Sequence, residues 1–278
     1  MIASTGFFVF YSFINWAFII KLKLIEPRSD IVEFFVPAAV SGLIVLFYLK
    51  GKIAKFKIEE KARWGIWIFC GVALFIPVMM AQIYIENQYG KLTISTSADQ
   101  IFNHEVSKYY SIKKATPKKA FTGIFISQYA VGRGNEKGVG CYFACPLSDS
   151  INVNGSNNIW IGVCFSSRYS NRVFDDKIEQ QRSIKAFIYS SIIEYKPYKY
   201  SVNYLENQPL DESDGFIKAI NQTHLKYDTN KLIILTEPSN SYEDRTNGTG
   251  SIALILLAAA NLLWIVTWIL SNLRLPKL

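Results

Sequence analysis

The residues best suited to chemistry are Cys141, Cys145 and Cys164, together with the two histidines of the chain, His104 and His224. Three thiolates and one imidazole are a ligand set that zinc accepts in a tetrahedral site. Alternating apolar residues around Cys141 and Cys145 predict a strand, however, and residues four apart on a strand lie about 13 Å from each other. Cys141, Cys145 and Cys164 are therefore a candidate thiol group, for which free buried thiols, a disulfide from Cys164, a metal site and a reactive thiol stay open. We assign no metal and no cofactor.

Histidine is nearly absent from the sequence, and both copies lie between the third and fourth apolar blocks. A serine or cysteine nucleophile needs a base within hydrogen-bond reach. Because no apolar block contains a histidine, an intramembrane Ser–His dyad is not possible. We therefore predict no catalytic residue.

Four apolar blocks predict that part of the chain lies in lipid, while the rest lies in water. A hydrocarbon core about 30 Å thick needs roughly 20 apolar residues of helix. The blocks predict transmembrane helices at about 5–20, 32–49, 65–84 and 252–270. The first is the shortest and contains Asn15. The fold class predicted from this pattern is a membrane protein with four transmembrane α-helices, arranged as three helices in residues 1–85 and a fourth in 251–278.

Basic residues in the short loops predict the orientation of these helices. The loop between the second and third blocks is rich in basic residues, which are Lys50, Lys52, Lys55, Lys57, Lys61 and Arg63. Such loops stay on the cytoplasmic side of a membrane. Both termini are then cytoplasmic, including the short tail after residue 270, and residues 86–250 lie outside, across a bacterial cytoplasmic (inner) membrane. Most of the formal charge of +8 is in these loops, so we expect no nucleic-acid partner.

Residues 86–250 change from a helical to a largely alternating apolar pattern. Two helical patterns occur, at Asp175–Glu194 and from Ser213 to about Thr223. The stretch Gly123–Cys145, broken by a turn at Gly132–Gly138, predicts a hairpin. The other strand patterns are Leu92–Ser95, Tyr109–Lys113, Ile159–Phe165 and Leu232–Thr236. This order predicts an extracytoplasmic α+β domain with a largely antiparallel sheet.

Several segments carry a resemblance to a known family: Lys50–Lys57, Phe75–Glu86, Tyr89–Thr93, Lys108–Ile112, Asp214–Ile220 and Leu235–Pro238. In these segments the chain resembles the membrane-proximal N-terminal region of a subset of bacterial rhomboid-family intramembrane serine proteases. Rhomboids carry their nucleophile in a Gly-x-Ser-Gly motif, whereas the nearest string here is Ala39-Val40-Ser41-Gly42. The resemblance therefore implies the accessory portion without the catalytic bundle, and it transfers no catalytic residue.

Together these patterns predict a non-catalytic multi-pass membrane protein that presents an extracytoplasmic interaction domain. Its expected partners are the lipid bilayer and a membrane or extracytoplasmic protein, such as a rhomboid-like protease or its substrate. An alternative is a ligand-binding, metal-binding or enzymatic domain that uses Cys141, Cys145, Cys164 and His224. A small channel or transporter is a weaker alternative, because the blocks contain few polar residues.

The predicted topology is testable with a reporter inserted near residue 150. A reporter that is active only outside the cytoplasm should be active there, because residues 86–250 follow an odd number of predicted spans from a cytoplasmic N-terminus. The same reporter fused near residue 55 should be inactive. An inactive reporter at position 150 together with an active one near residue 55 would contradict the orientation.

Overall fold

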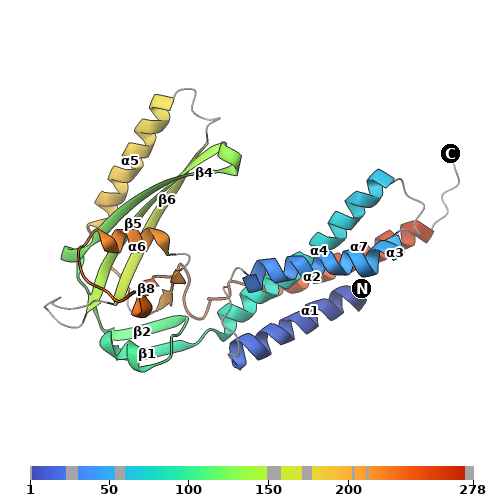
Figure 1. Cartoon of the computed structure of the whole chain (residues 1–278), viewed down its shortest axis with the longest axis horizontal. Helices are drawn as coiled ribbons and strands as arrows, with labels where there is room; N and C mark the ends of the chain where they lie inside the picture. The colour runs from blue at the N-terminus through green and yellow to red at the C-terminus, as the bar shows by residue number, and fades with distance from the viewer. Residues whose placement is uncertain are drawn as a thin grey trace. The chain divides into compact units, whose positions relative to one another are not determined.

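The computed structural model describes residues 2–22, 31–53, 60–148, 158–170, 177–201, 204–210 and 213–272. They form two compact units, one comprising Met1–Gly90 with Tyr242–Leu278 and the other Lys91–Ser241 (Figure 1). We refer to them as the helical unit and the α+β unit. The helical unit is thus built from two parts of the chain that are far apart in sequence.

The helical unit consists of four helical stretches. The first is α1 (Ile2–Ile14), which continues as π-helical turns η1 (Asn15–Lys21). The second comprises η2 (Ile31–Phe35), α2 (Val36–Ile44), η3 (Val45–Leu49) and α3 (Lys50–Ile53). The third is α4 (Glu60–Tyr89) and the fourth is α7 (Thr249–Asn272).

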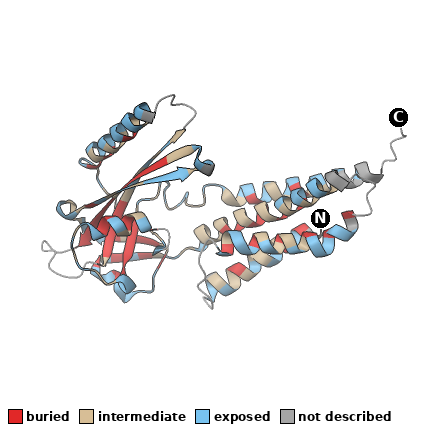
Figure 2. Cartoon of the chain, turned by 45° about the horizontal axis from the view of Figure 1, so that its top comes forward, coloured by how far each residue is buried: buried red, intermediate tan, exposed pale blue. Residues whose placement is uncertain are grey.

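Three stretches of this unit are long and apolar enough to cross a membrane: Ile31–Leu49, Arg63–Tyr89 and Thr249–Val266. The apolar part of α1, Ser4–Ile19, is shorter. The predicted long apolar helices are therefore present in three of the four places, and their insertion in a membrane, like the span in α1, stays a prediction. Many residues of these helices are exposed (Figure 2), and large apolar side chains are among them, such as Phe10, Phe47 and Ile255 at 66%, 83% and 66% exposure. Such a surface suits hydrocarbon rather than water.

Helix α4 is the central element of the helical unit, since α1, α2 and α7 all pack against it. Its end is fixed by Arg245, in the segment just before α7. The Arg245 guanidinium donates from Nε to the Asn87 carbonyl at 3.0 Å and from Nη2 to the Gln88 carbonyl at 2.9 Å. These bonds satisfy carbonyls that a helix C-terminus leaves without intrahelical partners. The start of α7 is thereby held at the end of α4.

The α+β unit contains one eight-stranded sheet and two longer helices. Its strands are β1 (Leu92–Ser97), β2 (Tyr109–Lys114), β3 (Thr116–Pro117), β4 (Gly123–Val131), β5 (Glu136–Ser148), β6 (Ile159–Ser170), β7 (Leu205–Asn207) and β8 (Ile233–Thr236). Its α-helices are α5 (Lys177–Tyr195) and α6 (Asp214–Asn221), and single 3-10 turns are η4 (Asp99–Asn103), η5 (Lys119–Phe121), η6 (Gly132–Gly134) and η8 (Thr229–Lys231).

The sheet is mixed: it contains parallel as well as antiparallel strand pairs. The order is β1-β2-β7-β8-β6-β5-β3, with β4 also paired to β5. The β1–β2 and β6–β8 pairs are parallel, and the other pairs are antiparallel. The predicted α+β class is confirmed, and the predicted strand directions are correct only in part. The physical reason is that β6 reaches β8 through α5, β7 and α6, and such a long connection permits a parallel neighbour.

Strand β5 is the spine of the unit. It pairs along its length with β6 on one side and with β4 on the other, from Gly123↔Ala144 to Val131↔Glu136. The predicted hairpin is therefore present, with a turn shorter than expected. Gly132 and Gly134 adopt φ values of 60° and 85°, which only glycine adopts without strain.

The two helices cover opposite faces of the β5–β6 pair. Phe187, Ile188 and Tyr195 of α5 pack on the face that carries Cys141 and Phe143. The remaining face carries Ala144 and Trp160, and Phe216, Ala219 and Ile220 of α6 pack there. Both helices lie where the sequence predicts them; Asp175 and Asp176, the predicted start of the first, are outside the described residues.

Gly123 sets the distance between β4 and α6. A Cβ atom at this position would lie 1.8 Å from the backbone oxygen of Ala219. Because the clash is with backbone rather than with a flexible side chain, α6 or β4 would have to move. A glycine is therefore required where β4 begins.

We expect Gly123→Ala to destabilise the α+β unit by about 1–3 kcal/mol, the usual cost of forcing a backbone shift in a packed core. Hydrogen exchange of peptides from β5 and α6 in the full chain measures the change. Ser127→Ala, on the same strand, is the control and should change stability by less than about 0.5 kcal/mol. Equal protection in the two variants would contradict the close approach.

Candidate functional site

The structure separates the three cysteines of the candidate thiol group. Cys141 and Cys145 lie on one face of β5 and are fully buried. Cys164 of β6 is paired with Tyr142, and since neighbours on a strand point to opposite faces, it lies on the other face of the sheet from Cys141. All three are free thiols. A disulfide from Cys164 to either of the others would have to pass through the sheet.

A metal site has no support from the described part of the chain. No group of three or more His, Cys, Asp or Glu residues in those ranges is arranged to hold an ion. His224 follows α6 in an exposed loop with φ of 58°, and His104 lies in the exposed segment after η4. The two histidines and the thiols are therefore parts of different elements.

Cys145 is embedded in a hydroxyl and aromatic cluster under the end of α5. Burial raises the pKa of Cys145 to about 11, although hydrogen bonds with Tyr195 and Tyr200 lower it in part. Burial likewise raises the pKa of Tyr195 to about 12. The Tyr195 hydroxyl lies 2.8 Å from Thr122 Oγ1 and accepts a hydrogen bond from Tyr200 at 3.3 Å. At neutral pH these groups are uncharged, and a neutral buried thiol is a poor nucleophile.

Lys119 is the cation nearest to this cluster, and its role is structural. Its Nζ donates to the carbonyls of Tyr195 and Lys196 at 3.2 Å each, and also to that of Tyr198. The ammonium also lies 5.0 Å from the centre of the Tyr195 ring. A cation at this place stabilises a helix C-terminus and its partial negative charge. Lys119 thus closes α5, and its charge lowers the pKa of Cys145 without offsetting the effect of burial.

Cys141, like Cys145, is a buried thiol with a raised pKa. Burial raises its pKa, and a hydrogen bond with the Ser191 side chain of α5 lowers it in part. Ser191 itself donates to the Phe187 carbonyl at 2.9 Å. The face of β5 that carries the two buried thiols is consequently packing surface for α5.

The serine closest to a rhomboid motif, Ser41, lies on α2 in the helical unit. It is 1% exposed, and its hydroxyl finds no hydrogen-bond partner within the described residues. Both histidines of the sequence belong to the α+β unit. No imidazole of the helical unit can therefore act on Ser41.

Polar residues of the helical unit join its helices to each other. Asn15, at the start of η1, donates to Gln82 of α4, which is itself fully buried and donates to the Val78 carbonyl at 3.2 Å. Ser4 of α1 donates to Asn261 of α7 at 2.6 Å. These pairs satisfy polar groups within an apolar unit. They join α1 to α4 and to α7.

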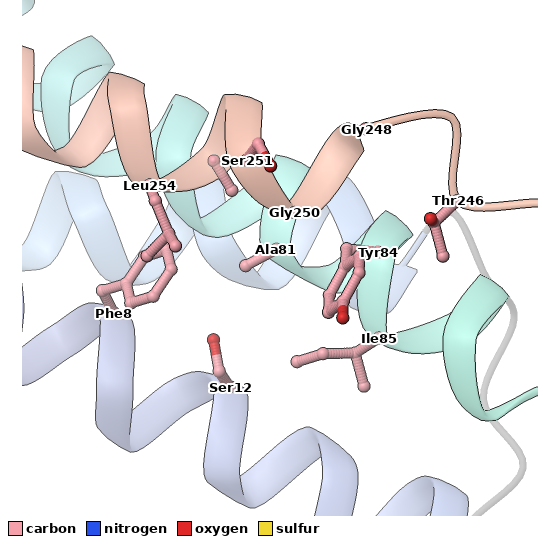
Figure 3. Close-up of a pocket in the computed structure, with 11 residues that line it drawn as sticks. Phe8, Ser12, Ala81, Tyr84, Ile85, Thr246, Gly248, Gly250, Ser251 and Leu254 are labelled. Atoms are coloured by element: carbon pink, nitrogen blue, oxygen red, sulfur yellow. The ribbon is translucent and has the colours of Figure 1, made fainter. Parts of the chain in front are cut away.

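A cavity of about 400 Å³ lies between α1, α4 and the start of α7. Its lining residues are Phe8, Ser12, Ala81, Tyr84, Ile85, Thr246, Gly248, Gly250, Ser251, Ala253 and Leu254. Figure 3 shows Phe8 and Leu254 together at one end, and Tyr84, Ile85 and Thr246 toward the other. The volume falls in the range of roughly 300–1,000 Å³ that ligand sites occupy. Sequence patterns give no sign of this cavity, since its walls come from segments over 200 residues apart.

Strand β4 presents the second candidate surface. It pairs with β5 on one side, and no described strand pairs with its other side. Ile124 and Ile126 are 40% and 38% exposed, and the strand contains neither a charge nor a proline. Natural proteins commonly protect edge strands with charged residues or proline. This surface could have been predicted from the sequence, because the run Gly123–Val131 contains no charged residue.

Comparisons with known proteins add no family: no protein-family model, no curated protein and no solved structure matches the chain significantly.

We expect the buried thiols to resist alkylation in the native protein. At pH 7, with a pKa of about 11, roughly one Cys145 in ten thousand is a thiolate. Iodoacetamide should modify Cys164 first because Cys164 is exposed, although its pKa is also raised to about 11, and at pH 7 Cys145 should react appreciably only after denaturation. Its native rate should rise with pH up to about 11 instead of levelling off near 9. Mass spectrometry of tryptic peptides identifies each site.

The denatured, unreduced protein should expose four free thiols, because Cys70, Cys141, Cys145 and Cys164 are all unpaired in the structure. Two free thiols would establish a disulfide. Equal rates for Cys145 and Cys164 at pH 7 would contradict the packing described for β5.

Proposed function

We propose that this chain is a non-catalytic, multi-pass protein of the bacterial cytoplasmic membrane whose α+β unit binds an extended segment of a protein partner outside the cytoplasm. In this proposal four helices cross the bilayer, both termini are cytoplasmic and the α+β unit is the binding domain. The partner is a membrane or extracytoplasmic protein. A rhomboid-like protease or its substrate is the partner class that the sequence resemblance implies.

The observation that carries the proposal is the open edge of β4. A strand edge offers a row of backbone donors and acceptors that an extended peptide can use, as in β-strand addition. Nine residues, Gly123–Val131, are available. Main-chain bonds supply affinity, and the alternating side chains supply selectivity.

The side chains beside this edge favour an apolar, uncharged segment. Ile124 and Ile126 are paired with Phe143 and Cys141, so they continue the apolar face of β5 beyond the area that α5 covers. Tyr129 adds a ring that is 44% exposed. A bound strand would bury these exposed apolar groups, and that burial would favour binding.

The non-catalytic part of the proposal rests on the chemistry of the candidate residues. The two thiols on β5 are buried and neutral, and Lys119 is used at the end of α5. Ser41 has no imidazole in its own unit. Binding is the activity that this set of groups supports best.

Site-specific photocrosslinking tests the proposal. A photoreactive amino acid replaces Gln128, an exposed residue of β4, and the full chain is expressed in its membrane. A discrete adduct with one membrane or extracytoplasmic protein is expected. Ile126→Lys should reduce the adduct roughly tenfold or more, because an ammonium group would have to be buried in an apolar contact.

Ile94→Lys is the matched control. Ile94 lies on β1 at the opposite edge of the sheet and is 63% exposed, so this variant should leave the adduct unchanged. Hydrogen exchange of β5 checks that both variants are folded. An adduct equally strong in both, an adduct with a second copy of this chain, or reaction with lipid alone would overturn the proposal.

A further inference from the structure

We propose that the cavity between α1, α4 and α7 binds the acyl chain of a single amphiphile, supplied either by a membrane phospholipid or by a free fatty acid. This site lies wholly within the helical unit and is separate from the β4 edge. It requires that the unit be in contact with lipid, and it does not require the proposed protein partner.

The cavity exists because α1 is held at two separated points. Just after its end Asn15 bonds to Gln82 of α4, which also donates to Ser12 Oγ of α1 at 3.4 Å, and near its start Ser4 bonds to Asn261 of α7. Phe8 and Ser12 lie between these points along α1 and line the cavity. Each polar pair is costly to break in apolar surroundings. Between these attachment points a space of about 400 Å³ lies against α4 and α7.

The facing helices contribute small residues. Ala81 of α4 and Gly250 and Ala253 of α7 line the cavity. A Cβ atom on Gly250 would lie 2.8 Å from the ring of Tyr84, so α7 and α4 approach closely there. Ala81 and Ala253 are 5% and 1% exposed. This wall is thus rigid and packed, and the open space lies on the α1 side.

The distribution of polar groups matches an amphiphile. At one end lie the apolar side chains of Phe8 and Leu254, the hydroxyl groups of Ser12 and Ser251 line the middle, and toward the other end lie those of Tyr84 and Thr246 (Figure 3). The polar end is where α4 finishes and α7 begins, beside the Arg245 contacts with Asn87 and Gln88. A chain with its tail at Phe8 and its polar group at Thr246 satisfies both ends.

Hydrocarbon is also the solvent that the outer surface of this unit suits. Phe10 and Ile255, which neighbour the cavity-lining residues in sequence, are each 66% exposed. An acyl chain can therefore reach the cavity from the bilayer. Burial in a fixed cavity adds packing that a fluid bilayer does not supply.

Native mass spectrometry of the full chain in mild detergent tests the inference. The wild-type protein should retain one amphiphile, and the mass of the adduct separates a phospholipid from a fatty acid. Ser12→Phe fills the cavity and should weaken retention roughly tenfold, the effect of displacing about two methylenes, whereas Ser12→Ala, which removes the same hydrogen bond from Gln82 without filling the cavity, should retain the wild-type adduct. The control Val9→Phe adds the same ring at a position 58% exposed on α1 and should retain the wild-type adduct.

A second measurement does not depend on the fold of a variant. Fatty acid and phospholipid probes with a diazirine at the chain end are photolysed with the wild-type protein, and labelled residues are mapped. Labelling should be concentrated at Phe8 and Leu254. Uniform labelling of Phe10 and Ile255 with no enrichment in the cavity, or equal retention by the wild type and Ser12→Phe, would overturn the inference.

Discussion

The burial of β5 on both faces is the constraint on which the α+β unit depends. From Val139 to Ser148 nearly every residue of this strand is buried, which requires a helix on each face and a strand on each side. Helices α5 and α6 supply the faces, and β4 and β6 supply the sides. Once these places are filled, the thiols of Cys141 and Cys145 become part of the core, and β4 becomes the strand with an open edge. The burial of the thiol face of β5 and the exposure of the β4 edge therefore both follow from the central position of β5.

A different constraint shapes the helical unit. A polar side chain in apolar surroundings must find a partner, and Asn15, Gln82, Ser4 and Asn261 find each other across three helices. The same contacts that satisfy these groups fix the position of α1. Because hydrogen bonds fix distances more strictly than apolar contacts do, the helices are not free to close the remaining space. The polar residues that would suggest a channel when read singly instead explain a lateral cavity.

The sequence predicted the elements well and their partners less well. Periodicity placed α5, α6, the β4–β5 hairpin and the long apolar helices, because each of these depends on local pattern. The parallel pairs β1–β2 and β6–β8 depend on which distant strands meet, and no local pattern contains that information. For the same reason the sequence could name Asn15 as a polar exception but could not identify Gln82 as its partner. The cavity, which depends on the Asn15–Gln82 and Ser4–Asn261 pairs, was beyond any local signal.

The candidate site shows a related limit. Cysteine and histidine attracted attention because they are rare and reactive, yet the structure places Cys145 under Tyr195 and Tyr200, where its sulfur stays neutral. Reactivity depends on environment more than on residue type. The run Gly123–Val131 has no reactive group, and its significance lies in the absence of the charges and prolines that usually protect an edge. The two thiols of β5 are buried, whereas the backbone of β4 is open on the side away from β5, so the β4 edge is the observation that supports the proposed recognition by main-chain hydrogen bonds.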